Sequence, residues 1–213
     1  YQRRVREQSF ELGPLGANCY ILYDETREAV IVDPGDESLA VCNFIAEHQL
    51  TPKFILATHV HFDHVFGANF FKIKYPEAQV LVHAADLASW ERQVKFAQQF
   101  QVKVPASFKG SKPDTVFDQN IKFGNQELKI LHSPGHTPGS VCFYLEKQKK
   151  CFTGDTIFAV GVGRTDFEGG SEQQMAASIG MLKATLPEGV RIYSGHGESA
   201  LIEDAIEYAE MMI

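Results

Sequence analysis

The segment Thr58-His59-Val60-His61-Phe62-Asp63-His64 gathers imidazole and carboxylate side chains in one short stretch of chain. His59 and His61 stand two positions apart, so a helix would point them to nearly opposite sides, whereas an extended segment or a tight loop points them the same way. They can then share one metal ion, and Asp63 and His64 can reach towards a second position. The alternative, a polar loop with surface histidines, is disfavoured because further candidate ligands follow in matching contexts.

The residues on either side of this segment predict where it lies in the fold. Phe54-Ile55-Leu56-Ala57 is short and apolar and indicates a buried strand. Residues 64–75 are typical of a helix that Pro76 ends. The histidines therefore lie where a buried strand ends and a helix begins, a usual place for a functional site in α/β sheets.

Strands alternate with helices along the rest of the chain, a pattern that favours a mixed α/β architecture. Asp36 is expected to cap a helix that carries Leu39, Cys42 and Ile45, and residues 101–119 are expected to form an irregular surface loop. Strands are predicted at 20–23, 29–32, 79–83, 121–123, 127–132, 141–145, 151–153 and 190–193, and further helices at 84–100, at 171–186 and from about 199.

Composition narrows the class of protein. The 213 residues suit one domain, 1–213, and the apolar share of 44% with a charged share of 22% is ordinary for a globular protein. The net charge of −7 argues against a general nucleic-acid binder and against attraction to anionic membranes. The longest apolar runs, Cys19–Tyr23 and Val141–Leu145, are far shorter than the roughly 20 residues of a membrane span, and we expect no signal segment from the opening residues.

The cysteines predict the redox environment. Cys19, Cys42, Cys142 and Cys151 show no CxxC spacing and lie within apolar runs. Buried thiols in a reducing compartment are favoured over disulfides, which leads us to expect a cytoplasmic protein.

Three later polar residues also follow predicted strands. His136 lies in a loop rich in Gly and Pro, Asp155 follows an apolar strand, and His196 stands between Gly195 and Gly197. Each alone is a weak signal, but together with the first segment they suggest one convergent site. His132 and His83 also lie near strand ends and are interpreted as structural.

Taken together, these motifs resemble the metallo-β-lactamase superfamily from Asn18 to Gly197. Residues 58–64 resemble its H-x-H-x-D-H motif, and Asp33-Pro34-Gly35 resembles its first motif. The resemblance implies an α+β fold, an αβ/βα four-layer sandwich in which two mixed β-sheets lie face to face with helices on both outer faces and the metals at one sheet edge.

The resemblance also implies a ligand set for two divalent metal ions. His59, His61 and His136 would hold the first ion, Asp63, His64 and His196 the second, and Asp155 would bridge the two. Imidazole and carboxylate ligands suit zinc, which we favour, or iron or manganese. The true β-lactamase branch commonly has Cys where this chain has Asp155, which argues against that activity.

Within the superfamily, residues 154–158 and 163–170 are similar to the glyoxalase II group, the hydroxyacylglutathione hydrolases, in their compact bacterial form. That implies a hydrolase of small thioesters such as S-lactoylglutathione. Residues 197–213 are acidic and contain no Lys or Arg. We therefore expect no separate C-terminal glutathione-binding helical domain and a more open, less selective pocket.

The expected chemistry is attack on a thioester carbonyl by a hydroxide that two ions about 3.5–4 Å apart generate from a shared water. A thiolate of pKa about 8.5 leaves with little proton assistance, and the sequence shows no separate catalytic acid. Asp63 and Asp155 are the predicted catalytic carboxylates; capping of the following helix is the structural alternative for Asp63. No Gly-x-Ser-x-Gly elbow supports a serine nucleophile.

Other readings stay open. Arg164 would contact an anionic substrate or pair with Asp166, and Phe158, Phe167 and residues 90–105 are candidate pocket walls. Residues 163–167 also resemble the iron persulfide dioxygenases, in which counterparts of His59, His136 and Asp155 hold one iron. A lactone or ester hydrolase and a non-catalytic metal-binding module are further alternatives, and the oligomeric state is left open.

Overall fold

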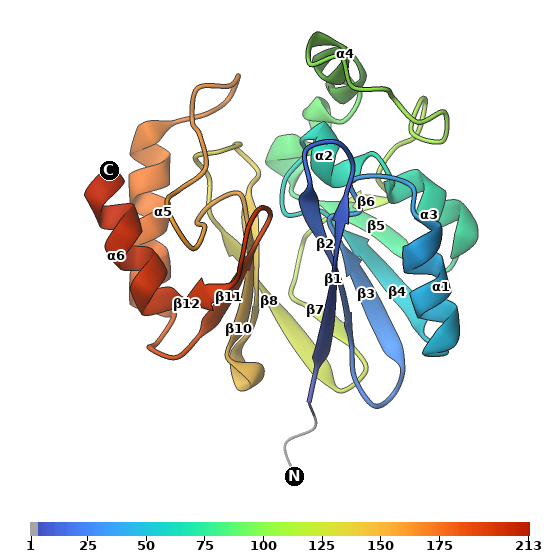
Figure 1. The fold of residues 1–213 in the computed structure, drawn as a ribbon, viewed down its shortest axis with the longest axis horizontal. Coiled ribbons are helices and arrows are strands. Elements are labelled where there is room, and N and C mark those ends of the chain that lie inside the picture. The colour runs from blue at the N-terminus through green and yellow to red at the C-terminus, as the bar shows by residue number, and fades with distance from the viewer. Residues whose placement is uncertain (1–3) are drawn as a thin grey trace.

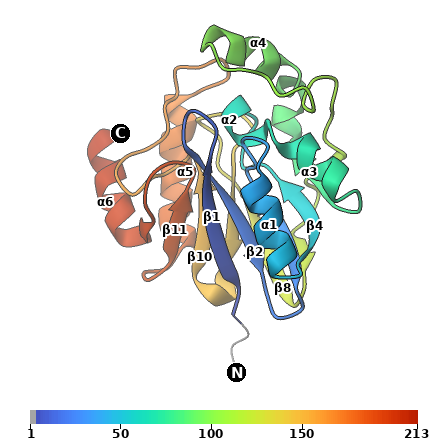
Figure 2. The ribbon, with the colours of Figure 1, turned by 45° about the vertical axis from the view of Figure 1, so that its right-hand side comes forward.

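The computed structural model describes residues 4–213 and contains two six-stranded sheets (Figures 1 and 2). In the first sheet β1, β2 and β3 are antiparallel, whereas β3, β4, β5 and β6 are parallel. In the second sheet only the pair β10 and β11 is parallel. The strands of the first sheet are β1 (Arg6–Leu12), β2 (Ala17–Tyr23), β3 (Glu28–Val32), β4 (Thr51–Leu56), β5 (Gln79–Val82) and β6 (Thr115–Val116). Those of the second are β7 (Ile121–Phe123), β8 (Gln126–His132), β9 (Val141–Leu145), β10 (Lys150–Gly154), β11 (Arg191–Ser194) and β12 (Ala200–Leu201).

Side chains along the central strands alternate between two apolar layers. In β2, Cys19 and Ile21 belong to the apolar cluster under the helices, whereas Tyr20 and Leu22 belong to the cluster between the two sheets. Successive side chains of a strand point to opposite faces, so a strand that is apolar on both faces must be covered on both. In the second sheet, Phe143 likewise faces the first sheet, and its neighbours along β9 face the opposite way.

Helices cover the outer face of each sheet (Figure 1). The first sheet carries α1 (Leu39–Glu47) and α3 (Ala68–Lys74) on this face, and the second carries α5 (Glu172–Thr185) and α6 (Ile202–Met212). The short α2 (Phe62–Val65) lies at the edge of the first sheet, and α4 (Arg92–Gln99) packs beyond it. Two 3₁₀ turns, η1 (Ala84–Ser89) and η2 (Glu146–Gln148), complete the described elements. This arrangement confirms the predicted α+β sandwich of two mixed sheets between helical layers.

Several predicted boundaries were wrong. The helix expected over 64–75 is divided into α2 and α3 at Gly67, whose N–H donates to the Pro34 carbonyl at 2.8 Å. A Cβ at Gly67 would lie 2.2 Å from the backbone oxygen of Asp36, so the close approach of this loop requires glycine and interrupts the helix. Ser38, and not Asp36, caps α1 by accepting from the Val41 N–H.

The helix expected over 84–100 is also interrupted. It is divided into η1 and α4, and Trp90 at the break is buried against Phe108 with ring centroids 5.1 Å apart. The loop expected over 101–119 contains the short strand β6, which pairs with β5. Tertiary packing of one aromatic ring thus decides where the helical pattern stops.

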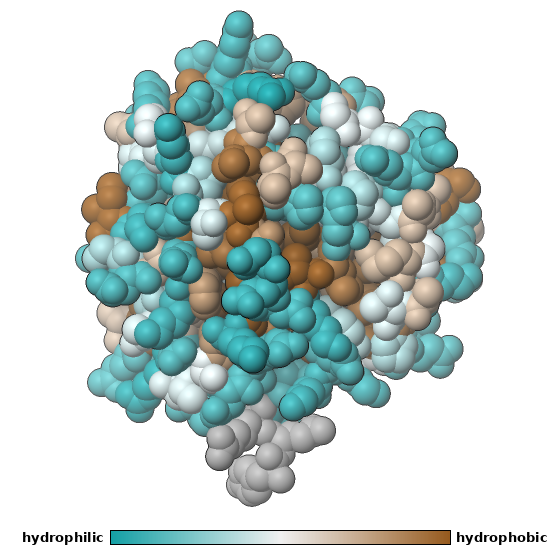
Figure 3. Space-filling model, turned by 180° about the vertical axis from the view of Figure 1, so that it is seen from behind, coloured by the Kyte–Doolittle hydropathy of each residue, from teal (hydrophilic) through white to brown (hydrophobic). Residues whose placement is uncertain are grey.

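The four cysteines are all buried and free, as the thiol prediction required, within the part of the chain that the structure describes. Across residues 4–213, no helix combines the length and the apolar character that crossing a bilayer demands. Hydrophilic side chains cover most of the face opposite to that of Figure 1, and apolar ones gather in a band down its middle (Figure 3).

Candidate metal centre

The candidate ligands follow strand ends at one edge of the two sheets. His59 and His61 lie just beyond β4, and His136 lies in the loop between β8 and β9. Asp155 follows β10 directly, and His196 follows its parallel neighbour β11. Backbone hydrogen bonds join the two sheets at this edge, because the Thr58 carbonyl accepts from the Val141 N–H at 2.8 Å and the Gly195 carbonyl from the Asn18 N–H at 2.7 Å.

The structure brings the seven predicted side chains together in two groups. The potential ligand atoms of each group lie within 4.8 Å of one another, and the groups are His59, His61 and His136, and Asp63, His64, Asp155 and His196. The carboxylate of Asp155 lies between the groups. Its Oδ2 is 3.7 Å from His59 Nε2, 3.5 Å from His136 Nε2 and 3.6 Å from His196 Nε2, and its Oδ1 is 3.4 Å from His64 Nε2.

Unpartnered polar atoms within this cluster fit a bound cation. Within residues 4–213, the buried atoms His59 Nε2, His64 Nε2 and Asp155 Oδ1 have no hydrogen-bond partner. Buried polar atoms are otherwise almost always paired, so such a convergence requires an explanation. His61 Nδ1 also faces His136 Nε2 at 3.0 Å, two nitrogens that a shared cation would satisfy. Imidazole nitrogen and carboxylate oxygen are donors that zinc, iron and manganese accept.

The remaining ring nitrogens are held by partners outside the cluster. His64 Nδ1 lies 2.9 Å from Asp33 Oδ2, which also accepts from the hydroxyl of Thr58 at 2.7 Å. Because that hydroxyl donates to Asp33, its oxygen is free to accept from His59 Nδ1 at 3.0 Å. One carboxylate therefore directs the Nε2 atoms of two rings into the cluster, as such partners of metal-binding histidines generally do.

His136 is oriented by a backbone group. Its Nδ1 donates to the carbonyl of Arg164 at 2.7 Å, which leaves Nε2 facing Asp155. The guanidinium of Arg164 pairs with Asp166 through two hydrogen bonds of 2.6 and 2.7 Å and lies 3.9 Å over the ring of Phe167. The backbone, rather than the side chain, thus connects Arg164 to the donor cluster.

Burial and neighbouring charges set the protonation states. Burial, reinforced by His136, lowers the pKa of His61 to about 3, and burial with His64 lowers the pKa of His59 well below its usual value. Burial alone would raise the pKa of Asp63, but the charge of His64 and the contact with His196 Nε2 outweigh it, and the pKa lies well below the ordinary value. His59 and His61 are therefore neutral at pH 7, the state in which imidazole binds a metal.

The other polar residues singled out in the sequence lie outside the cluster. His83 and His132 stack on each other with centroids 4.2 Å apart, and His132 Nε2 donates to the Pro138 carbonyl, in agreement with a structural interpretation. Asp63 is not the N-cap of α2, since His61 occupies that position, and its carboxylate instead lies 3.2 Å from His196 Nε2.

A cavity of about 450 Å³ opens onto the cluster. Besides the potential ligands, its walls are Gly163, Arg164 and the apolar side chains of Leu15, Phe62, Phe96, Phe100, Phe158 and Phe167. Phe96 and Phe100 come from the region of α4, within residues 90–105, which the sequence predicted as a pocket wall without identifying single residues. Their spacing of four along one helix face was the available signal. Asp86, buried behind the histidine loop, was missed, and no pattern in the sequence marks it.

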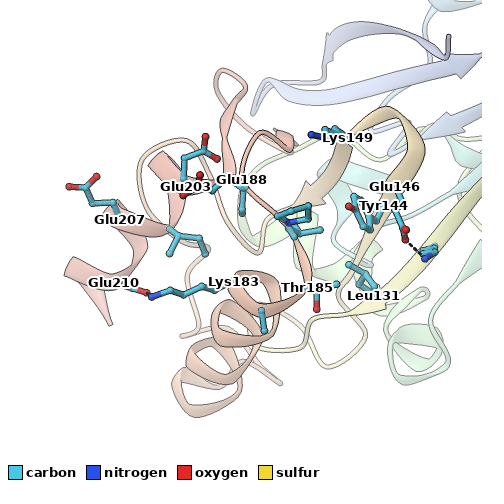
Figure 4. A pocket seen from close by; sticks show the side chains of 16 residues that line it. Leu131, Tyr144, Glu146, Lys149, Lys183, Thr185, Glu188, Glu203, Glu207 and Glu210 are labelled. Carbon is cyan, nitrogen blue, oxygen red and sulfur yellow. Dashed lines mark hydrogen bonds and ion pairs between the residues drawn. The ribbon is translucent and has the colours of Figure 1, made fainter. Parts of the chain in front are cut away.

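The largest described cavity lies elsewhere. It has a volume of about 960 Å³ and is lined by residues of α5, α6 and the outer face of the second sheet, including Glu203, Glu207, Lys183, Leu131 and Tyr144 (Figure 4). None of the seven clustered residues lines it, and no unpartnered buried polar atom of the described chain belongs to it. Size alone therefore does not locate the candidate site.

Comparison with known proteins agrees with the fold and the motifs. The family model of the metallo-beta-lactamase superfamily matches residues 12–196. The hydroxyacylglutathione hydrolase GloC of Haemophilus influenzae is 34% identical over 188 residues, covering 87% of each chain. Among solved structures, the BLEG-1 B3 metallo-beta-lactamase has a TM-score of 0.88 at 30% identity, over 97% of this chain and 99% of that one. The di-iron-bound form of TTHA1623 has a TM-score of 0.84 at 31% identity, over 96% and 99%.

The family model spans most of the chain, and it ends at the last of the seven clustered residues, His196. The two mixed sheets, the helices on both outer faces and the donor cluster at the sheet edge are found where the motif resemblance placed them. The chain belongs to the metallo-beta-lactamase superfamily, a superfamily of metallo-hydrolases.

Proposed function

We propose that this protein binds two divalent metal ions and hydrolyses small thioesters of the hydroxyacylglutathione type. The observation that carries the proposal is the position of Asp155, whose carboxylate approaches nitrogens of both histidine groups at 3.4–3.7 Å. A bridging carboxylate between two donor groups suits two ions. His59, His61 and His136 would hold the first, Asp63, His64 and His196 the second, and Asp155 both.

The bound ions would lower the pKa of a coordinated water towards 7 and stabilise negative charge on a carbonyl oxygen. The chain's own groups prepare for this. Asp33 and the Arg164 carbonyl hold the far nitrogens of His64 and His136, so these rings present their Nε2 atoms without rotating. Asp63 accepts from His196 and keeps its negative charge, which favours a cation beside it.

The cavity walls support a thioester or an activated ester over an amide. Apart from the potential ligands and Arg164, every residue that lines the cavity is apolar or glycine. The described walls thus offer no separate acid for a poor leaving group. A thiol of pKa about 8.5 leaves as the thiolate without one. The aromatic rings of Phe62, Phe100 and Phe158 would contact the apolar parts of the substrate and exclude water.

The relatives support this substrate class and leave the metal open. One of them, GloC, is a hydroxyacylglutathione hydrolase, and a solved neighbour holds two irons. We propose zinc as the resident metal and iron as the alternative, because the nitrogen and oxygen donors present suit both. The guanidinium of Arg164, which already pairs with Asp166, is proposed to meet a substrate carboxylate at the mouth of the cavity.

Elemental analysis and a substrate panel test the proposal. Purified protein is analysed for metal content and then assayed with S-lactoylglutathione, other acylglutathiones, a lactone and a β-lactam. We expect about two ions per chain and the highest kcat/KM on a thioester. Two ions per chain with no turnover of any thioester would contradict the substrate assignment, and faster turnover of the β-lactam would replace it.

The persulfide dioxygenase alternative makes a different prediction. It needs a single iron held by His59, His136 and Asp155, and leaves Asp63, His64 and His196 without a metal role. The second donor group, with two nitrogens 3.2 and 3.4 Å from Asp63 Oδ2, favours the two-metal hydrolase. One iron per chain together with oxygen consumption on glutathione persulfide would decide for the dioxygenase.

A further inference from the structure

Asp86 lies outside the donor cluster, but its carboxylate joins the two loops that carry the first group of histidines. It is fully buried, on η1. Its Oδ2 accepts from the backbone N–H of Val60 at 2.9 Å and from the hydroxyl of Thr137 at 2.8 Å. Its Oδ1 accepts from the backbone N–H of Gly139 at 2.6 Å.

Two of the three donors adjoin the histidines in sequence, and the third, Gly139, lies three residues after His136. Val60 stands between His59 and His61, and Thr137 directly follows His136. The two loops come from different sheets, and the facing nitrogens of His61 and His136 are 3.0 Å apart across the gap. One carboxylate therefore binds both loops, through the Val60 backbone between His59 and His61 and through the Thr137 hydroxyl and the Gly139 backbone after His136.

The contact between Asp86 and the His136 loop leaves no free space. A Cβ at Gly139 would lie 2.6 Å from the Asp86 Cγ and 2.7 Å from its backbone nitrogen. Thr137 is fixed in turn by Ser140, whose hydroxyl lies 2.7 Å from its own. The loop can therefore shift relative to Asp86 only if these hydrogen bonds break.

The three hydrogen bonds to Asp86 require a carboxylate at this position. Within residues 4–213 Asp86 forms no ion pair, so the hydrogen bonds offset the cost of burying this group. Two of the donors are backbone N–H groups that cannot reverse their polarity. An amide offers one oxygen and one NH₂, so an asparagine would set N–H against N–H on one side.

We propose that Asp86 is a positioning residue that sets the spacing of His59 and His61 relative to His136 and thereby the affinity of the first metal position. The inference rests on the proposed binding of two ions. Asp86 touches none of the rings and acts through the backbone of Val60 and the loop after His136. The second position is held by Asp33 and by β11 and does not depend on Asp86.

The test compares Asp86→Asn with the control Asp24→Asn. Asp24 is also a buried carboxylate that accepts several hydrogen bonds, among them those from Thr26 and Asn125, but it follows the far end of β2. Zinc affinity at each position is measured by chelator competition, with circular dichroism on the same samples. We expect D86N to weaken one of the two ions by about 10- to 100-fold and to leave the other unchanged, whereas D24N keeps both affinities.

A milder variant covers the case in which D86N does not fold. Thr137→Val removes one of the three donors and nearly preserves the side-chain volume, so we expect a smaller loss at the same position. Wild-type affinity at both positions in D86N, or in T137V if D86N is unfolded, would overturn the inference, as would equal weakening of both ions. The readout is metal affinity, so a wild-type protein that binds two ions without thioesterase activity would refute the proposed function and leave this inference intact.

Discussion

The Oδ2 atom of Asp33 lies 2.9 Å from Nδ1 of His64, in a site where Asp33 is only 2% exposed. The same carboxylate accepts from the backbone N–H and the hydroxyl of Thr58, the residue before His59. A single side chain at the end of β3 thus orients one histidine from each of the two groups. Its backbone has a φ of +54°, a conformation that Asp and Asn adopt more readily than other residues with side chains.

Replacing Asp33 with Asn should weaken both metal positions. Asparagine tolerates the left-handed backbone, so the change tests the loss of an acceptor rather than backbone strain. We expect about a 10- to 100-fold loss of affinity for each ion, measured by chelator competition. An effect confined to the second ion, the one assigned to His64, would show that the contact from Thr58 to His59 does not matter for binding.

Removing the metal should lower stability without unfolding the chain. The three apolar clusters contain none of the seven clustered side chains, so the sheets and helices keep their packing. Ions present at 100 times their dissociation constant would add about 2.7 kcal/mol each. We expect the melting temperature to fall on chelation with the far-UV circular dichroism at 25 °C unchanged. Loss of the helical signal at 25 °C would indicate a metal-dependent fold.

Gly195→Ala should abolish binding of the bridged pair of ions. A Cβ there would lie 2.1 Å from Asp155 Oδ1 and 2.7 Å from His64 Cε1, so the carboxylate must move away from the second group. Gly180→Ala is the matched control, because Gly180 is an exposed residue of α5 with no atom within 4 Å of the added Cβ. The control should raise stability by about 0.5–1 kcal/mol with both ions retained. Two tightly bound ions in G195A would contradict the placement of Asp155.

Arg164→Met should affect the substrate more than the metal. The Arg164 carbonyl, which accepts from His136, is retained in the variant, so we expect unchanged metal content. The ion pair with Asp166 is exposed, and such pairs contribute little to stability, so the melting temperature should hardly change. A rise in KM for an acylglutathione, with a smaller change for a neutral thioester, would identify Arg164 as a substrate contact. An equal change in KM for both substrates would show that Arg164 has a structural role only.

Asp24→Asn should change the pH dependence of stability. Burial would raise the pKa of Asp24, but hydrogen bonds from Thr26, Asn125 and Gln126 outweigh it and lower the pKa below its ordinary value. A carboxyl whose folded pKa is lowered stabilises the protein above its unfolded pKa of about 3.9, and this contribution is lost as the pH falls through the folded pKa. We expect D24N to be less stable than wild type at pH 7 and the difference to shrink below about pH 4, as measured by urea unfolding. A constant difference across this range would refute the assignment.

Much of the fold could be predicted because local patterns agree with the final packing. The runs around Ile21, Ile31 and Phe143 are apolar at every position, and in a strand this requires a covered layer on each side. Helix interruptions escaped prediction because distant contacts cause them. Gly67 is pressed against the backbone of Asp36, and Trp90 is buried on Phe108, and neither contact follows from residues nearby in the chain.

The candidate site could likewise be predicted only in part. Histidine and aspartate side chains after strand ends, from His59 to His196, could be identified in the sequence because donor type and spacing are local properties. The groups that orient these side chains could not be identified in the sequence. Asp86 and the carbonyl of Arg164 resemble any buried acid and any peptide oxygen until the loops are brought together.

By itself, the sequence determined the kinds of donor present, the alternating strands that carry them and a family in which they converge. Only the tertiary structure decided that Asp155 stands between the two histidine groups, that Asp33 and Asp86 hold their loops, and that Phe96 and Phe100 wall the cavity. The physical reason is that a donor's chemistry belongs to one residue, whereas distance and orientation to within a few tenths of an ångström depend on hydrogen bonds between segments far apart in the chain.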